Sequence, residues 1–182
     1  MPAFIALAVL CGCGRPSLPA NYEAVLREIA AVEFQIGWLT PDHGGKTLAY
    51  VHATGAGRSL ALLDLKTLAR QPIPLTNEVI QVSGWSPDDR YLAFVESPTP
   101  RPGEESKLRA SWVTLYQRES GQARRISGRE GVAENYFFWL SPETYFFASR
   151  GVTAPLAELF LGSVADGPGK KVSNFMPELV VM

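Results

Sequence analysis

The sequence predicts an all-β protein, a partial β-propeller of about three four-stranded antiparallel blades behind a short N-terminal segment. A tryptophan, a Ser/Thr-Pro-acidic turn and a second apolar strand recur three times at intervals of roughly 50 residues, close to the length of one propeller blade. The 16 glycines and 14 prolines fall mostly between apolar runs, as expected for short strands joined by tight turns. Runs such as 60–63 and 91–95 are apolar throughout, which indicates strands covered on both faces. Strands buried in a β-sandwich would give the same runs and are the structural alternative.

The first residues have the character of an export signal. Residues 4–10 are apolar but shorter than the roughly 20 residues that span a bilayer. The following spacing, Leu10-Cys11-Gly12-Cys13, resembles a bacterial lipobox. That resemblance implies that residues 1–13 are a signal peptide, that Cys13 carries the lipid and that Cys11 is lost with the peptide. The segment lacks the basic residues that open a signal peptide, so either the true start lies upstream or the signal is not genuine.

Residues 14–31 are expected to form a linker and one short helix. Apolar residues at 22, 25, 26, 29 and 30 follow a period of 3.6. The first strand is expected to begin at residue 32, so the helix is only a short lead-in to the β-region.

The β-region divides into three blades, over residues 32–75, 79–126 and 134–173. Each blade is expected to contain four strands: 32–38, 47–51, 59–65 and 71–75; 79–85, 91–96, 110–117 and 122–126; 134–139, 145–149, 157–162 and 170–172. Residues 178–182 look like the start of a fourth inner strand, which indicates a fragment of a longer protein. Alone, such a fragment is expected to expose apolar surface and to self-associate.

The recurring turn has a physical role. In the second blade, Pro87 sets φ for the second position of a type I turn, while Ser86 and Asp88 can bond nearby amides. A glycine would be the easiest residue at the next position, where this blade has Asp89. The residues expected to define the repeat are Trp38, Pro41, Asp42, Trp85, Pro87, Asp88, Trp139 and Pro142.

This unit, Trp-Ser-Pro-Asp followed three residues later by Leu-Ala-Phe, resembles the repeat of TolB-like β-propellers, a WD-like family of bacterial envelope proteins. The resemblance is strong for the second blade, good for the first and weak for the third. It implies a non-enzymatic, envelope-anchored module on the periplasmic side that binds a protein or another macromolecule. The same repeat builds the propellers of prolyl-oligopeptidase-type serine hydrolases, so a catalytic domain in the longer protein is the alternative. A polysaccharide-binding or lyase-associated propeller is a third possibility.

Composition and motifs exclude some functions. A net charge of −1 and a pI near 6.1 argue against nucleic-acid binding. The chain has no nucleophile elbow, P-loop, zinc-protease or dinucleotide motif, and no cofactor is implied. His43 and His52 lack an acidic third ligand, so they are expected to be solvated loop residues.

Partner contacts are expected in two places. Arg101, Glu104 and Glu105 lie in a long polar loop between two strands, and loops of this kind often carry binding function. Trp112 lies in a third strand and has no aromatic counterpart in the other blades. The other tryptophans are expected to pack between blades, although aromatic side chains also line carbohydrate and peptide sites.

Overall fold

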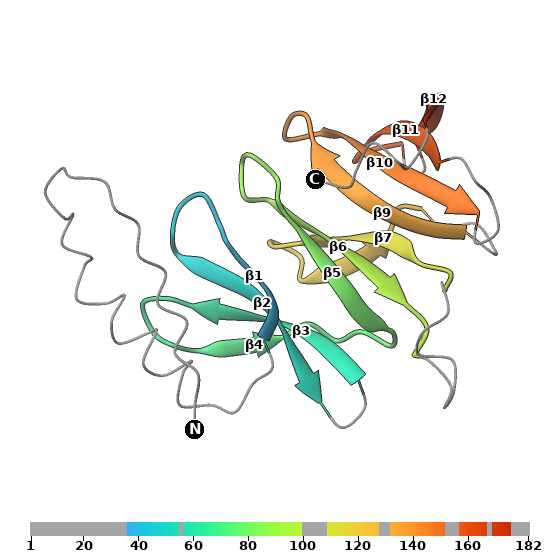
Figure 1. The fold of residues 1–182 in the computed structure, drawn as a ribbon. Helices are drawn as coiled ribbons and strands as arrows, with labels where there is room; N and C mark the ends of the chain where they lie inside the picture. Colours follow the sequence, from blue (N-terminus) through green and yellow to red (C-terminus); the bar gives the residue numbers. More distant parts are fainter. Residues whose placement is uncertain are drawn as a thin grey trace, which may run out of the picture.

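In a computed structural model of the chain, the structure describes residues 36–54, 57–99, 109–127, 132–151, 157–166 and 169–175. These residues form twelve strands in three separate four-stranded antiparallel sheets, which lie side by side as blades (Figure 1). The all-β, partial-propeller prediction is therefore confirmed. Within the described ranges, no helix long and apolar enough to cross a membrane is found. The predicted signal peptide, linker helix and fourth-blade start lie outside these residues.

The strands follow one another in simple up-and-down order within each blade. Blade one contains β1 (Ile36–Pro41), β2 (Thr47–Thr54), β3 (Gly57–Asp64) and β4 (Arg70–Pro72). Blade two contains β5 (Glu78–Trp85), β6 (Tyr91–Ser97), β7 (Trp112–Gln117) and β8 (Gln122–Arg125). Blade three contains β9 (Val132–Trp139), β10 (Thr144–Gly151), β11 (Ala157–Ser163) and β12 (Lys170–Phe175). The first strands β1, β5 and β9 are neighbours in space, as the inner strands of a propeller must be.

Many strand boundaries differ from the prediction by one to three residues, the ends of the first and fourth strands among them. The first strand was expected to end at Trp38, but β1 continues through Pro41. The fourth strand was expected over residues 71–75, but β4 ends at Pro72. Pro72 and Pro74 lack an amide N–H, so the ladder cannot continue regularly beyond Ile73.

The cores lie between blades. One apolar cluster joins the facing sides of blades one and two, with Leu60 and Leu62 against Leu92 and Phe94. A second cluster joins blades two and three, with Leu115 among its members. Alternate residues of β6 therefore pack against opposite neighbours, which explains why its sequence is apolar throughout. This double burial is the arrangement that the continuous apolar runs predicted.

Blade three presents an apolar surface on its far side. Cross-strand pairing aligns Phe138, Phe146 and Leu161 in one row across β9, β10 and β11. Phe138 is 56% exposed and Leu161 is 41% exposed, and Val172 of β12 is exposed as well. These four residues are called the open face below.

Candidate functional site

The predicted turn after the first strand is present in blade two. The Ser86 carbonyl accepts a hydrogen bond from the Asp89 amide at 2.8 Å, and Pro87 occupies the second position of this turn. Ser86 Oγ accepts the Tyr91 amide at 3.0 Å and donates to Asp88 Oδ1 at 2.7 Å. The turn is thus held by the side chains that the sequence indicated.

Asp89 connects this turn to blade one. Its φ is +60°, a left-handed conformation that favours glycine, and the equivalent residue of blade one is Gly45 with φ +61°. The carboxylate accepts the amides of His43 at 2.9 Å and Gly44 at 3.0 Å, and contacts His43 Nδ1 at 2.8 Å. Partial burial alone would raise the pKa of Asp89, but these contacts outweigh it and lower the pKa. Asp89, which stands where blade one has Gly45, therefore stabilises the contact between blades one and two.

The repeat of blade one is offset from the sequence alignment. Trp38 was aligned with Trp85, and Pro41 was placed in the turn with Pro87. In the structure Pro41 pairs with Leu48 just as Trp85 pairs with Leu92, so Pro41 occupies the tryptophan position. Trp38 thus lies three residues before the position that corresponds to Trp85.

Asp42 accordingly takes the place of Ser86. Its carboxylate accepts the amides of Lys46 at 2.7 Å and Thr47 at 3.1 Å. The side chain is only 1% exposed and pairs with Arg118 of blade two, Nη2 to Oδ2, at 2.8 Å. The Arg118 guanidinium also lies 4.1 Å from the centroid of the Trp85 ring. A charged pair and a cation–π contact thus join blades one and two.

The three repeat tryptophans occupy different environments. Trp85 is buried, while Trp38 is 44% exposed. The Trp38 indole N–H donates to the Ile80 carbonyl at 3.1 Å, and that of Trp139 donates to the Gly84 carbonyl at 3.2 Å. Both indoles therefore reach β5 of the central blade, from opposite sides.

The turn of blade three is shorter than the other two. Ser141 Oγ accepts the amides of Glu143 at 3.2 Å and Thr144 at 3.0 Å, and half-buried Pro142 lies between these residues. This hydroxyl contact repeats the role of Ser86 Oγ in blade two. The turn therefore keeps its hydroxyl acceptor although the sequence resemblance is weakest here.

Trp112 is buried, with 9% of its surface exposed. Its indole N–H donates to Glu96 Oε2 at 3.2 Å, and the Arg125 guanidinium lies 4.0 Å from its ring centroid. A partner would reach this ring only if Arg125 moved away. The other predicted contact residues, Arg101, Glu104 and Glu105, and the lipid-acceptor candidate Cys13 lie outside the described residues.

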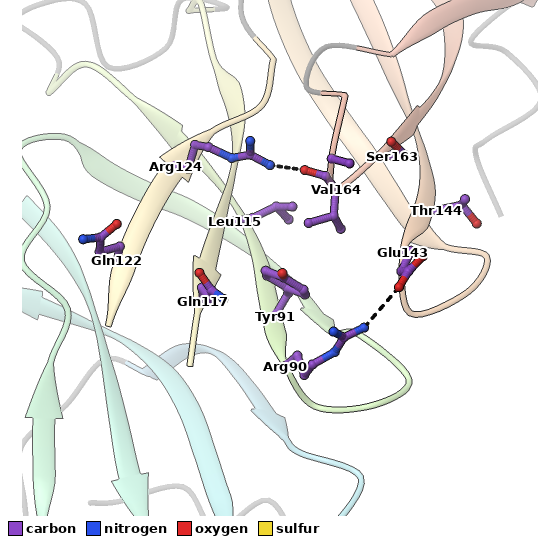
Figure 2. Close-up of a pocket in the computed structure, with 11 residues that line it drawn as sticks. Arg90, Tyr91, Leu115, Gln117, Gln122, Arg124, Glu143, Thr144, Ser163 and Val164 are labelled. Carbon is purple, nitrogen blue, oxygen red and sulfur yellow. Dashed lines mark hydrogen bonds and ion pairs between the residues drawn. The ribbon is translucent and has the colours of Figure 1, made fainter. Parts of the chain in front are cut away.

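A hollow of about 550 Å³ separates the outer halves of blades two and three (Figure 2). Leu115 and Tyr91 form its apolar part, and Figure 2 shows them between two arginine side chains. Arg124 donates across the gap to the Val164 carbonyl, and Arg90 lies 3.5 Å from Glu143 (Nη2 to Oε1). The polar residues at its edges are Gln117, Gln122, Thr144 and Ser163. Its volume and mixed lining are typical of ligand sites, and we name it the blade 2–3 pocket.

No residue of this pocket was predicted from the sequence as a binding residue. A nearby signal was Gly162, one residue before the end of β11, because Gly within a strand often marks a close approach. A Cβ on Gly162 would lie 2.6 Å from Tyr145 Cε2. Burial raises the pKa of Tyr145 to about 12, and its hydroxyl donates to the Ser163 carbonyl at 3.2 Å.

A metal centre finds no support in the part of the chain that the structure describes. No group of three His, Cys, Asp or Glu side chains there is placed to hold an ion. His43 lies in a turn and is exposed, as expected, and its Nδ1 also contacts Asp89. His52 lies within β2 and is half-buried, so it is not the solvated loop residue that was expected.

Comparison with known proteins identifies the fold. No family model and no curated protein matches the chain. Among solved structures, a putative TolB from Agrobacterium tumefaciens has a TM-score of 0.56 and 12% identity, covering 78% of this chain and 50% of that chain. An oligogalacturonate lyase in complex with manganese has a TM-score of 0.59 and 14% identity, with 79% and 43% coverage. An acylaminoacyl peptidase from Pyrococcus horikoshii has a TM-score of 0.54 and 15% identity, with 76% and 24% coverage.

These similarities agree with a TolB-like propeller fold. At such identities they carry the fold alone, because propellers support many unrelated functions. The chain spans half or less of the length of these three proteins.

Proposed function

We propose that this chain is a propeller module of a bacterial envelope protein, and that it binds a protein partner without catalysing a reaction. The observation that carries the proposal is the blade 2–3 pocket, where apolar side chains lie between two arginines on a rigid sheet scaffold. Similarity to TolB structures supports the same class of protein. The module is part of a longer protein in this proposal, and Cys13 anchors it to the membrane on the periplasmic side.

Site-directed photo-crosslinking in cells tests protein binding. A benzoylphenylalanine at Gln122, on the exposed edge of the pocket, is expected to give a discrete adduct with one envelope protein. The matched control position is Ala69, which holds the place of Gln122 in blade one and is also exposed. Equal labelling at both positions, or none at Gln122, would contradict the proposal.

The lipid anchor has a separate test. Metabolic labelling with palmitate is expected to tag the full-length protein, and Cys13→Ser is expected to abolish the tag. A tag that survives the substitution would remove the anchor from the proposal without affecting the binding site.

A second candidate function is the propeller of a serine hydrolase. It is favoured by the similarity to the Pyrococcus horikoshii acylaminoacyl peptidase and to dipeptidyl peptidase 4 of Porphyromonas gingivalis, which has a TM-score of 0.59 and 12% identity. Labelling the full-length protein with a fluorophosphonate distinguishes the two candidates. A hydrolase would react through an activated serine, whereas a binding module would not.

A further inference from the structure

The repeat provides an internal comparison for the blade 2–3 pocket. At the equivalent place between blades one and two, the space is filled by two large side chains of β7 and its following turn. Tyr116 is 2% exposed, and its hydroxyl lies 3.5 Å from Gln71 Nε2. Arg118 extends over Trp85 to reach Asp42.

Blade three has much smaller residues at both positions. Tyr116 pairs with Leu92, and Gly162 pairs in the same way with Tyr145, so Gly162 is the counterpart of Tyr116. The Arg118 amide donates to the Arg90 carbonyl, and the Val164 amide donates to the Glu143 carbonyl, so Val164 is the counterpart of Arg118. The Tyr145 ring occupies the space beside Gly162, so the difference that reaches the pocket is the isopropyl group of Val164 in place of the Arg118 guanidinium.

The charge of the two interfaces differs as well. Between blades one and two, the position of Arg124 is held by neutral Gln71, and the buried charge is the carboxylate of Asp42. Between blades two and three, two arginines line the pocket: Arg90 pairs with the carboxylates of Asp88 and Glu143, whereas Arg124 bonds only the neutral Val164 carbonyl among the contacts described. The arginine fork matches a carboxylate with two parallel hydrogen bonds. The pocket thus favours an apolar ligand that also carries negative charge.

We propose that the blade 2–3 pocket receives an aromatic side chain of a protein partner, with a neighbouring carboxylate of the partner bound by Arg124. The ring lies over Leu115, Tyr91 and Val164, in the space that Arg118 fills at the preceding interface. This inference rests on the proposed function, because it names the chemistry of the partner segment.

Amide chemical shifts of the labelled 182-residue chain test the inference. The probe is the acetylated and amidated dipeptide aspartyl-tyrosine, compared with asparaginyl-tyrosine and aspartyl-alanine. Saturable changes in chemical shift are expected at the amides of Leu115, Gln117 and Val164. Both comparison peptides are expected to bind at least tenfold more weakly. Shifts that do not saturate, or that arise only outside the pocket, would overturn the proposal.

Three variants sharpen the test. Val164→Arg introduces the residue that stands at this position between blades one and two, and is expected to weaken dipeptide binding at least tenfold. Ala165→Phe blocks the pocket from its edge and provides the same test if the first variant does not fold. Arg124→Gln introduces the blade-one residue and is expected to remove the preference for aspartate over asparagine. Arg70→Gln, the same charge change in blade one, is expected to leave binding unaltered. Unchanged affinity in both blocked variants would refute the assignment.

Two further outcomes separate this inference from the proposed function. A crosslink from Gln122 without any dipeptide binding would overturn the aromatic–carboxylate chemistry while protein binding stands. Binding of 4-hydroxyphenylacetate with no dipeptide binding and no crosslink would overturn both, and would identify a small aromatic acid as the ligand.

Discussion

Asp89 shows how one side chain stabilises two elements at once. A glycine would suit its φ of +60° better, yet only a carboxylate can accept the amides of His43 and Gly44 together. The backbone strain of a left-handed residue costs about 1 kcal/mol. Charge-assisted hydrogen bonds contribute about 2 kcal/mol each at most, so the contact between blades outweighs the strain.

Replacing Asp89 with glycine tests this balance. Asp89→Gly keeps the backbone conformation but removes the acceptor, and we expect a loss of about 2 kcal/mol in the free energy of unfolding. Asp89→Asn keeps one acceptor oxygen and should lose less. Urea denaturation measures both, with Lys66→Ala as an exposed control. A glycine variant as stable as the parent would show that the carboxylate contributes nothing.

Asp42 makes stability depend on pH. Burial alone would raise its pKa, but the amides of Thr47 and Lys46 and the Arg118 guanidinium outweigh burial and lower the pKa. A carboxyl group whose pKa is lower in the folded state contributes its full stabilisation of the fold at pH values above its pKa in the unfolded chain, about 3.9. That contribution is lost as the pH falls through the pKa of the folded state. We therefore expect stability to decline below about pH 4. The Asp42→Asn variant is expected to be less stable than the parent at pH 7. Its free energy of unfolding, measured with urea, should change less with pH in this range than that of the parent. An equal pH dependence in both proteins would contradict the role assigned to Asp42.

The residue scale is also where sequence reasoning reached its limit. The turn around Pro87 was predicted with its bonding side chains, because turn chemistry is local. The offset of Trp38 by three residues was not, because register depends on which residues pair across the ladder, and neighbouring sequence motifs do not fix that pairing. The blade 2–3 pocket was missed for a related reason: only the strand register shows that Val164 stands at the position of Arg118.

At the scale of elements, each blade is a small sheet that cannot cover its own faces. β6 packs against both neighbouring blades with alternate side chains, and β10 packs against blade two with Tyr145 and Phe147, so sequence patterns predicted the location of both strands well. The outer strands β4 and β8 are short and exposed, and their patterns are correspondingly weak. The end of β4 was predicted less well than that of β8, because proline rather than burial decides where β4 ends.

Gly162 and Tyr145 form a close contact between two strands, and their energetic coupling can be measured. Gly162→Ala places a Cβ 2.6 Å from the Tyr145 ring, and overpacking of this kind costs about 1–3 kcal/mol. In a Tyr145→Leu background, a leucine stands opposite residue 162, as Leu92 stands opposite Tyr116 in blade two. We expect Gly162→Ala to lower the free energy of unfolding much less in that background. A double-mutant cycle by urea unfolding tests the coupling, and strict additivity would contradict it.

At the scale of the whole molecule, packing is sequential. Blade two is covered on both sides, and its residues Ala93, Val95, Val113, Leu115 and Ile126 contribute to the core with blade three. The strand registers place Phe146 and Leu161 of blade three at the positions of Ala93 and Leu115, and Val172 lies at the register shift of β12 beside them. The open face therefore has the same apolar pattern as a face that another blade covers.

This pattern predicts self-association of the isolated 182-residue chain. Exposed apolar patches larger than a few hundred Å² are unusual on monomers, and the open face carries two aromatic rings in edge contact, Phe138 and Phe146, beside Leu161 and Val172. We expect sedimentation velocity to show a mass above 19.9 kDa that rises with concentration. Leu161→Glu should shift the chain toward monomer by placing a charge in the centre of the row, whereas Lys66→Glu on blade one should not. Monomeric behaviour of the parent chain at high concentration would mean that the open face does not drive association in water. Blade packing in this protein would then depend on more than apolar complementarity.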